Sequence, residues 1–263
     1  MDKYVDFDNY LNDTEGTTDE IETIEKKEIK NKDNGNDNNL VKFPISSAKE
    51  NMMNKQCDYK TLAIMTLASS VDLKDKDKKG VGYRTVTKDK VITFTENTEE
   101  FSKTKKLTLE RNMRKLSQLE GNLVDAYKNS HGRIEYRINY ADKNSRCYVT
   151  IEEEILKRLS CSHNSTVIKL YVLLKYMCAN GERRLTREYL AKQIGLSTKS
   201  KDNLKMISHM TDDLYTLGYI NKRIVQISSV TKEVYYYVNS FETWKQIQKE
   251  NKEKQYDTTE SLK

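Results

Sequence analysis

Hydrophobic and polar residues follow two different periods along this chain, one typical of helices and one typical of strands. From residue 134 to residue 140, Ile and Tyr alternate with Glu, Arg and Asn, which predicts a strand with one solvated face. From residue 167 to residue 178 the chain is almost continuously apolar, which predicts a buried helix. Asn180-Gly181 follows it, and a glycine there is a common helix end.

The same order of elements appears twice: helix, strand, helix, turn, helix, strand, strand. In the first half we predict helices over residues 46–71, 98–103 and 106–119, and strands over 91–94, 123–127 and 134–140. In the second half we predict helices over 152–160, 167–178, 187–194, 202–217 and 242–250, and strands over 184–186, 220–227 and 233–238. An offset of 98 residues superimposes apolar positions of the two long helices, which indicates a duplicated architecture. The aligned pairs are Leu109 and Ile207, Leu116 and Leu214, and Leu119 and Leu217.

Composition narrows the fold class. Hydrophobic residues make up 36% of the chain and charged residues 33%, so we expect small cores under heavily charged surfaces. One proline and nine glycines favour helices with short connections over a loop-rich β-sandwich. We predict an α+β, mainly helical protein with an acidic disordered tail over residues 1–45 and two domains over 46–145 and 146–241. A C-terminal helix and polar tail follow over 242–263.

The charge is distributed unevenly. Residues 1–39 contain five lysines and twelve acidic residues, a net charge of −7. Residues 40–263 contain 41 basic and 28 acidic residues, a net charge of +13. A globular part with this balance is suited to binding phosphates, although a solvated, lysine-rich surface produces the same balance.

Cysteine usage and hydropathy indicate a soluble, cytoplasmic protein. The four cysteines are widely spaced and form no CxxC pair, so we expect reduced, buried thiols. No stretch approaches the ~18 consecutive apolar residues of a membrane span, and no charged-then-apolar signal opens the chain. We therefore expect no membrane association.

Known catalytic patterns are missing from the sequence. Cys161, His163 and Cys178 lack a fourth ligand at zinc spacing. The three histidines form no pair one residue apart, which a rolling-circle endonuclease needs, and no GxxxxGK[ST] phosphate loop occurs. We expect neither an enzyme nor a bound metal or cofactor.

The clearest motif is the segment from Arg187 to Ser197 together with the later Leu217-Gly-Tyr-Ile220. Apolar residues lie on one face of its first helix, a glycine turn follows, and a leucine fills the gap between the helices. This pattern resembles the helix-turn-helix of winged-helix DNA-binding proteins, in which a recognition helix leads into the first strand of a wing. The resemblance implies two tandem winged-helix domains.

The segment from Thr108 to Leu116 resembles the recognition helix of the same family. Leu109, Met113 and Leu116 are spaced to face the core, while Arg111 and Arg114 point away from it. Arginine can bridge guanine O6 and N7, asparagine can pair with adenine, and threonine and lysine bind phosphate. This helix therefore carries side chains that suit the major groove of duplex DNA.

The second copy departs from this pattern in its turn and in its charges. Its turn, over residues 197–202, is longer than usual. Asp212 and Asp213 stand where the first copy has Arg114 and Lys115. Two interpretations stay open: only the N-terminal end of this helix approaches DNA, or the second copy binds protein. In the first copy the helix before the turn is weakly apolar, so its turn is less clearly marked.

The resemblance implies a DNA-binding surface made of residues from both recognition helices, the second turn and the wings. Its members are Lys105, Lys106, Thr108, Arg111, Asn112, Arg114, Lys115, Arg133, Arg187, Ser197, Thr198, Lys199, Lys201, Lys205, His209 and Arg223.

Tandem winged helices without a catalytic motif resemble bacterial plasmid replication initiators. That resemblance covers about residues 46–240 and implies binding to repeated DNA sites, with the acidic tail as a contact for replication or transcription machinery. A transcriptional regulator or accessory factor of a plasmid or phage, and a protein-interaction scaffold, are the alternatives. The sequence also leaves a homodimer open.

Overall fold

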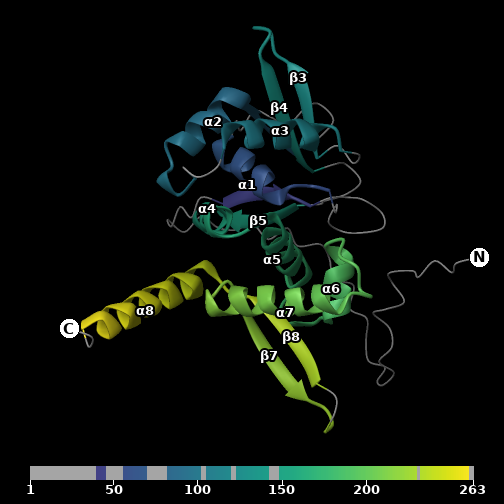
Figure 1. Cartoon of the computed structure of the whole chain (residues 1–263), viewed down its shortest axis with the longest axis vertical. Coiled ribbons are helices and arrows are strands. Elements are labelled where there is room, and N and C mark those ends of the chain that lie inside the picture. The colour runs from purple at the N-terminus through teal and green to yellow at the C-terminus, as the bar shows by residue number, and fades with distance from the viewer. Residues whose placement is uncertain are drawn as a thin grey trace, which may run out of the picture. The chain divides into compact units, whose positions relative to one another are not determined.

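The computed structural model describes residues 40–45, 56–69, 82–101, 105–119, 123–141, 148–229 and 232–260. These residues form an α+β protein in which eight α-helices accompany three small antiparallel sheets (Figure 1). The α+β class predicted from the hydrophobic pattern is therefore confirmed for the described part of the chain. No helix in that part combines the length and the apolar character needed to cross a bilayer.

The first repeat contains three helices and a three-stranded sheet. Its elements are α1 (Tyr59–Ala68), β2 (Gly82–Thr87), α2 (Lys88–Glu96), the 3-10 turn η2 (Glu99–Phe101), α3 (Lys106–Ser117), β3 (Val124–Lys128) and β4 (Ile134–Ala141). The strand order is β2-β4-β3, so the last strand of the repeat lies in the middle of the sheet. In Figure 1 the far end of the β3–β4 hairpin projects beyond α2 and α3.

The second repeat has the same order of elements. They are α5 (Ser165–Met177), β6 (Arg183–Arg184), α6 (Arg187–Gln193), α7 (Lys201–Thr216), β7 (Ile220–Gln226) and β8 (Lys232–Val238). The strand order is β6-β8-β7, which matches the first sheet. α8 (Phe241–Glu260) follows and is longer than the predicted helix over 242–250.

The two repeats correspond residue by residue over much of their length. The offset of 98 residues that aligns α3 with α7 also relates β3 to β7 and β4 to β8. The third aligned pair, Leu119 and Leu217, is half-buried against the core, whereas the residues of the other two pairs are buried. These four buried residues are Leu109, Leu116, Ile207 and Leu214. Thr87 and Thr186 stand before α2 and α6, and each caps its helix by accepting a hydrogen bond from a backbone N–H three residues later.

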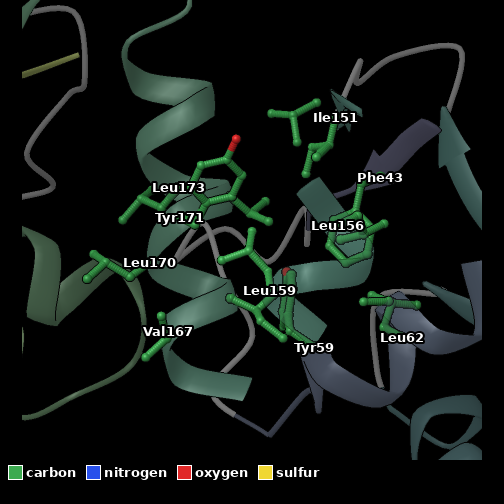
Figure 2. Packing of buried hydrophobic residues seen from close by; sticks show 14 of the residues in the cluster. Phe43, Tyr59, Leu62, Ile151, Leu156, Leu159, Val167, Leu170, Tyr171 and Leu173 are labelled. Atoms are coloured by element: carbon green, nitrogen blue, oxygen red, sulfur yellow. The ribbon is translucent and has the colours of Figure 1, made fainter. Parts of the chain in front are cut away.

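A two-stranded ribbon and one helix connect the repeats. β1 (Leu40–Pro44) pairs antiparallel with β5 (Tyr148–Glu152), and α4 (Glu153–Ser162) follows β5. α1 packs against both α4 and α5. Figure 2 shows buried side chains of this junction, which are Phe43, Tyr59, Leu62, Leu156, Leu159, Leu170 and Tyr171. The hydrophobic core therefore continues across the domain boundary that we predict after residue 145.

The prediction of a disordered tail over residues 1–45 is wrong at its C-terminal end. Val41, Phe43 and Ile45 are buried, and the strand that contains the first two pairs with β5. The alternation of buried and exposed residues in β1 spans only a few positions, so the polar composition of residues 1–45 as a whole hides it. Residues 1–39 and 46–55 lie outside the described part of the chain. The helix predicted over 46–71 begins at Tyr59 within that part.

Residues 91–94, which we predict as a strand, lie in helix α2 instead. Val91, Ile92 and Thr95 are buried at the spacing of a helix face. Thr87 caps the helix, with its hydroxyl oxygen 3.3 Å from the backbone nitrogen of Lys90. A short β-branched run does not distinguish a strand from a buried helix, and the cap favours the helix here. The strand that precedes α2 in this repeat is β2. Within residues 98–101, the described part of the helix predicted over 98–103, the chain forms only the short 3-10 turn η2.

Candidate nucleic-acid interface

Helix α3 presents a basic face on the side opposite the core. Leu109, Met113 and Leu116 recur at helical spacing and are all buried, so the remaining positions point outward. Six of the predicted DNA-binding residues are exposed there, as expected. They are Lys105, Lys106, Thr108, Arg111, Arg114 and Lys115.

No exposed acidic residue offsets these charges on α3. The one carboxylate of the helix, Glu110, is half-buried and lies 3.7 Å from the ammonium of Lys88 on α2. Among the residues that the structure describes, Arg111 and Arg114 have no carboxylate partner. Along the helix lies an open depression of about 370 Å³, lined by Leu107, Glu110, Arg111, Arg114, Lys115 and Gln118. The exposed charge therefore remains available for a ligand.

Asn112 does not belong to this exposed face. Its amide nitrogen donates hydrogen bonds to Asp58 Oδ2 at 2.7 Å and to Thr61 Oγ1 at 3.4 Å. Asp58 in turn accepts hydrogen bonds from backbone N–H groups at the start of α1. Asn112 thus connects α3 to α1, and the structure removes the geometric basis for pairing it with a base.

The turn of the first hairpin adds exposed cations near the sheet. Asn129 Oδ1 accepts hydrogen bonds from the backbone nitrogens of His131 and Arg133, each at 3.0 Å. Gly132 has a φ of 71°, a left-handed conformation that favours glycine. The Asn-Ser-His-Gly sequence over 129–132 is typical of a hairpin turn, and this turn holds Arg133 in an exposed position.

The helix-turn-helix predicted in the second repeat is present as α6, a turn and α7. Leu190, Ala191 and Ile194 are buried, as expected. Gly195 has a φ of 81°, and the backbone nitrogen of Leu196 donates to the carbonyl of Ala191 at 2.8 Å, which closes the turn. The turn residues predicted to bind DNA are exposed, and they are Ser197, Thr198 and Lys199.

The exposed face of α7 carries both signs of charge. Lys201, Lys205 and His209 are exposed, but so are the aspartates at 202, 212 and 213. Asp212 forms an ion pair with Lys222 on β7. This face is close to neutral, in contrast with α3.

Two predicted arginines of the second repeat have intramolecular partners. Arg187 Nη1 donates to the hydroxyl of Ser208 on α7 at 3.4 Å. Arg223 Nε donates to Glu182 Oε1 at 3.0 Å, and its guanidinium lies 4.7 Å from the ring centroid of Tyr235. This hydrogen bond lowers the pKa of Glu182 and raises the pKa of Arg223. Arg223 is therefore paired with Glu182, which directly precedes β6.

Sequence reasoning missed the residues that support the α3 surface. Asp58 could have been found, because an aspartate directly before an apolar helix is a strong N-cap signal. Leu107 is 80% exposed and lies in the depression along α3, and its exposure follows from its position outside the 109–113–116 spacing. No local signal marks Lys88 as the partner of Glu110, since the pair joins two helices.

His163 and Cys178, which we considered as metal ligands, contact other side chains and backbone groups instead of one another. His163 lies edge-on to Tyr219, with ring centroids 6.3 Å apart, and Cys178 Sγ donates to the carbonyl of Tyr236 at 3.3 Å. Within the described ranges, no three His, Cys, Asp or Glu side chains are close enough to hold a metal ion.

Comparisons of the chain with protein-family models, with curated proteins and with solved structures yield no match.

Proposed function

We propose that the chain is a sequence-specific binder of duplex DNA and that α3 enters the major groove. The observation that carries this proposal is the exposed face of α3, on which five lysines and arginines have no acidic residue among them. A helix about 10–12 Å in diameter matches a major groove about 12 Å wide.

The element order supports two tandem winged-helix units. Each repeat has a helix, a strand, two helices and a hairpin whose last strand lies in the centre of the sheet. This order resembles that of winged-helix proteins, in which the third helix is the recognition helix. In the first unit, α3 holds that position and the β3–β4 hairpin is the wing.

The exposed basic side chains of α3 and of the first hairpin, together with Leu107, suit particular groups on DNA. Arg111 and Arg114 lie one turn apart on α3 and suit guanine O6 and N7. Lys105, Lys106 and Arg133 suit phosphates on either side of the groove. The exposed Leu107 suits a thymine methyl group.

We propose that the biological role is replication initiation on a plasmid or phage, inside the cytoplasm. The tandem arrangement and the charge of +13 over residues 40–263 support DNA binding over a long site. The acidic segment 1–39 would contact replication or transcription machinery. A transcriptional regulator of a mobile element is the second candidate and shares the same DNA surface.

Footprinting on the DNA that flanks the coding sequence separates these roles. An initiator should protect several direct repeats, and a regulator should protect one operator at a promoter. A protein-interaction scaffold should protect neither, and its affinity for any duplex should be weak and insensitive to salt.

A further inference from the structure

Strand β7 is an open edge of the second sheet. Within the described part of the chain it pairs only with β8, along all seven of its residues. Figure 1 shows the β7–β8 hairpin extending away from the helices of its repeat. An edge strand exposes unpaired backbone N–H and C=O groups, which can pair with another chain.

The hydrogen-bond pattern shows which residues of β7 face that edge. The backbone nitrogen of Asn239 donates to the carbonyl of Tyr219 at 3.2 Å, and antiparallel pairs alternate between bonded and non-bonded residues. The backbone groups of Lys222, Ile224 and Gln226 therefore point away from β8. The N–H of Lys222 donates to the side chain of Asn221 at 2.7 Å, so Ile224 and Gln226 supply the open groups.

The charges that usually protect an edge strand are neutralised here. Lys222 forms an ion pair with Asp212, and Arg223 forms one with Glu182. Charged side chains on an edge strand discourage association, but these two already have carboxylate partners. The patch around β7 thus combines an open backbone with balanced charge.

Large apolar side chains surround the same edge. Ile224 and Ile227 are each 56% exposed, and Tyr215, whose ring lies 6.0 Å from the ammonium of Lys222, is 48% exposed. At the offset of 98 residues, the first repeat has Ala126 in place of Ile224 and Asn129 in place of Ile227. The second hairpin therefore has a more apolar edge than the first, and its exposed cations are Arg223 and Lys232.

We propose that β7 pairs antiparallel with β7 of a second copy of this chain, with the two-fold axis at Ile224. In this register Ile224 of each copy lies opposite Ile224 of the other, with Cα atoms about 5.5 Å apart. Lys222 then faces Gln226 of the second copy, and Arg223 faces Val225. Every cation therefore faces an uncharged residue, and the two sheets join into one of six strands.

The other two-fold symmetric registers between two β7 strands are less favourable than this one. A two-fold axis at Lys222 or Arg223 places like charges directly opposite each other, which is destabilising. An axis at Val225 also pairs open backbone groups, those of Ile224 with those of Gln226, but it places the exposed apolar Ile224 opposite an amide side chain. An axis at Gln226 pairs only the end of the strand and leaves Ile224 exposed.

The test is the mass of the full chain in solution, without DNA, by sedimentation equilibrium over a range of concentrations. We expect a dimer that dissociates on dilution. Ile224→Lys should make the chain monomeric at all concentrations, because it places two lysines at the axis. Ile224→Pro should do the same, since it removes an N–H that points away from β8 and leaves the intramolecular ladder intact.

Ala126→Lys is the matched control, because it introduces the same side chain at the equivalent edge position of the first sheet. It should leave the dimer unchanged, and circular dichroism should show that all three variants are folded. A monomeric wild-type chain, or an Ile224→Lys variant that remains dimeric, would overturn the proposal. If the wild-type chain is monomeric and Ile224→Lys changes only DNA affinity, the hairpin is a DNA contact instead.

Discussion

Asn112 and Arg111 are adjacent on α3 but have different surroundings. Arg111 is exposed on the basic face, whereas Asn112 donates to Asp58 and Thr61 of α1. Helical periodicity places both residues off the apolar stripe, so spacing alone assigns both to DNA. The structural role of Asn112 is shown only by its contact with Asp58 at the start of α1, which lies more than fifty positions away in sequence.

Asn112→Ala should therefore lower stability and leave DNA binding nearly unchanged. The loss of its hydrogen bonds should reduce the free energy of unfolding by about 0.5–1.5 kcal/mol, measured by urea denaturation. DNA affinity per folded molecule should stay near that of the wild type. A large loss of affinity with unchanged stability would assign Asn112 to the DNA surface after all.

Cys57 should be unreactive in the folded chain at alkaline pH. Burial raises the pKa of its thiol to about 12 from the ordinary value of 9.0, so the reactive thiolate is scarce. The stability linked to this group is present below pH 9 and is lost as the pH rises toward 12. At pH 9, iodoacetamide should label Cys57 much faster in urea-unfolded protein than in native protein, as peptide mass spectrometry can measure. Equal rates would contradict the burial of this thiol.

At the scale of elements, the local signals that predicted the structure correctly were turns and long periodic runs, whereas the caps at Asp58 and Thr87 were not used. The turn at 129–132, the α6–α7 motif and α3 follow from such signals in adjacent residues. The strand over 82–87 and the β1–β5 ribbon could not be predicted in this way. Thr87 ends β2 and also caps α2, and Val41 finds its partner Ile151 across a large sequence separation.

Two glycines with similar backbone conformations should respond differently to substitution. Gly132 has a φ of 71°, and a Cβ added there would meet no atom within 4 Å, so Gly132→Ala should cost about 1–2 kcal/mol from backbone strain alone. Gly218 has a φ of 73°, and a Cβ there would lie 2.7 Å from Ile247 Cγ2 on α8. Gly218→Ala should cost more, because α8 must also shift. Equal melting temperatures for the two variants would contradict the packing of α8 against this turn.

At the scale of the molecule, the shared core should make the two repeats unfold together. Leu159 on α4 is fully buried in the junction between α1 and α5, so Leu159→Ala should cost about 2–5 kcal/mol. Trp244, the single tryptophan, reports on the second repeat, where its ring stacks on Tyr219 at 5.9 Å. Urea transitions followed by tryptophan fluorescence and by far-ultraviolet circular dichroism should coincide. Two separate transitions would show that the repeats are independent domains.

The central claim is that α3 contacts bases in the major groove, and Arg111→Ala tests it most directly. The full chain is titrated at fixed salt against a duplex that it selects from random sequence and against a scrambled duplex. Arg158→Ala is the matched control, since Arg158 is an exposed arginine on α4. We predict that Arg111→Ala weakens binding to the selected duplex by about 1–3 kcal/mol and barely affects the scrambled one. Unchanged affinity of a folded Arg111→Ala variant for the selected duplex would contradict the account.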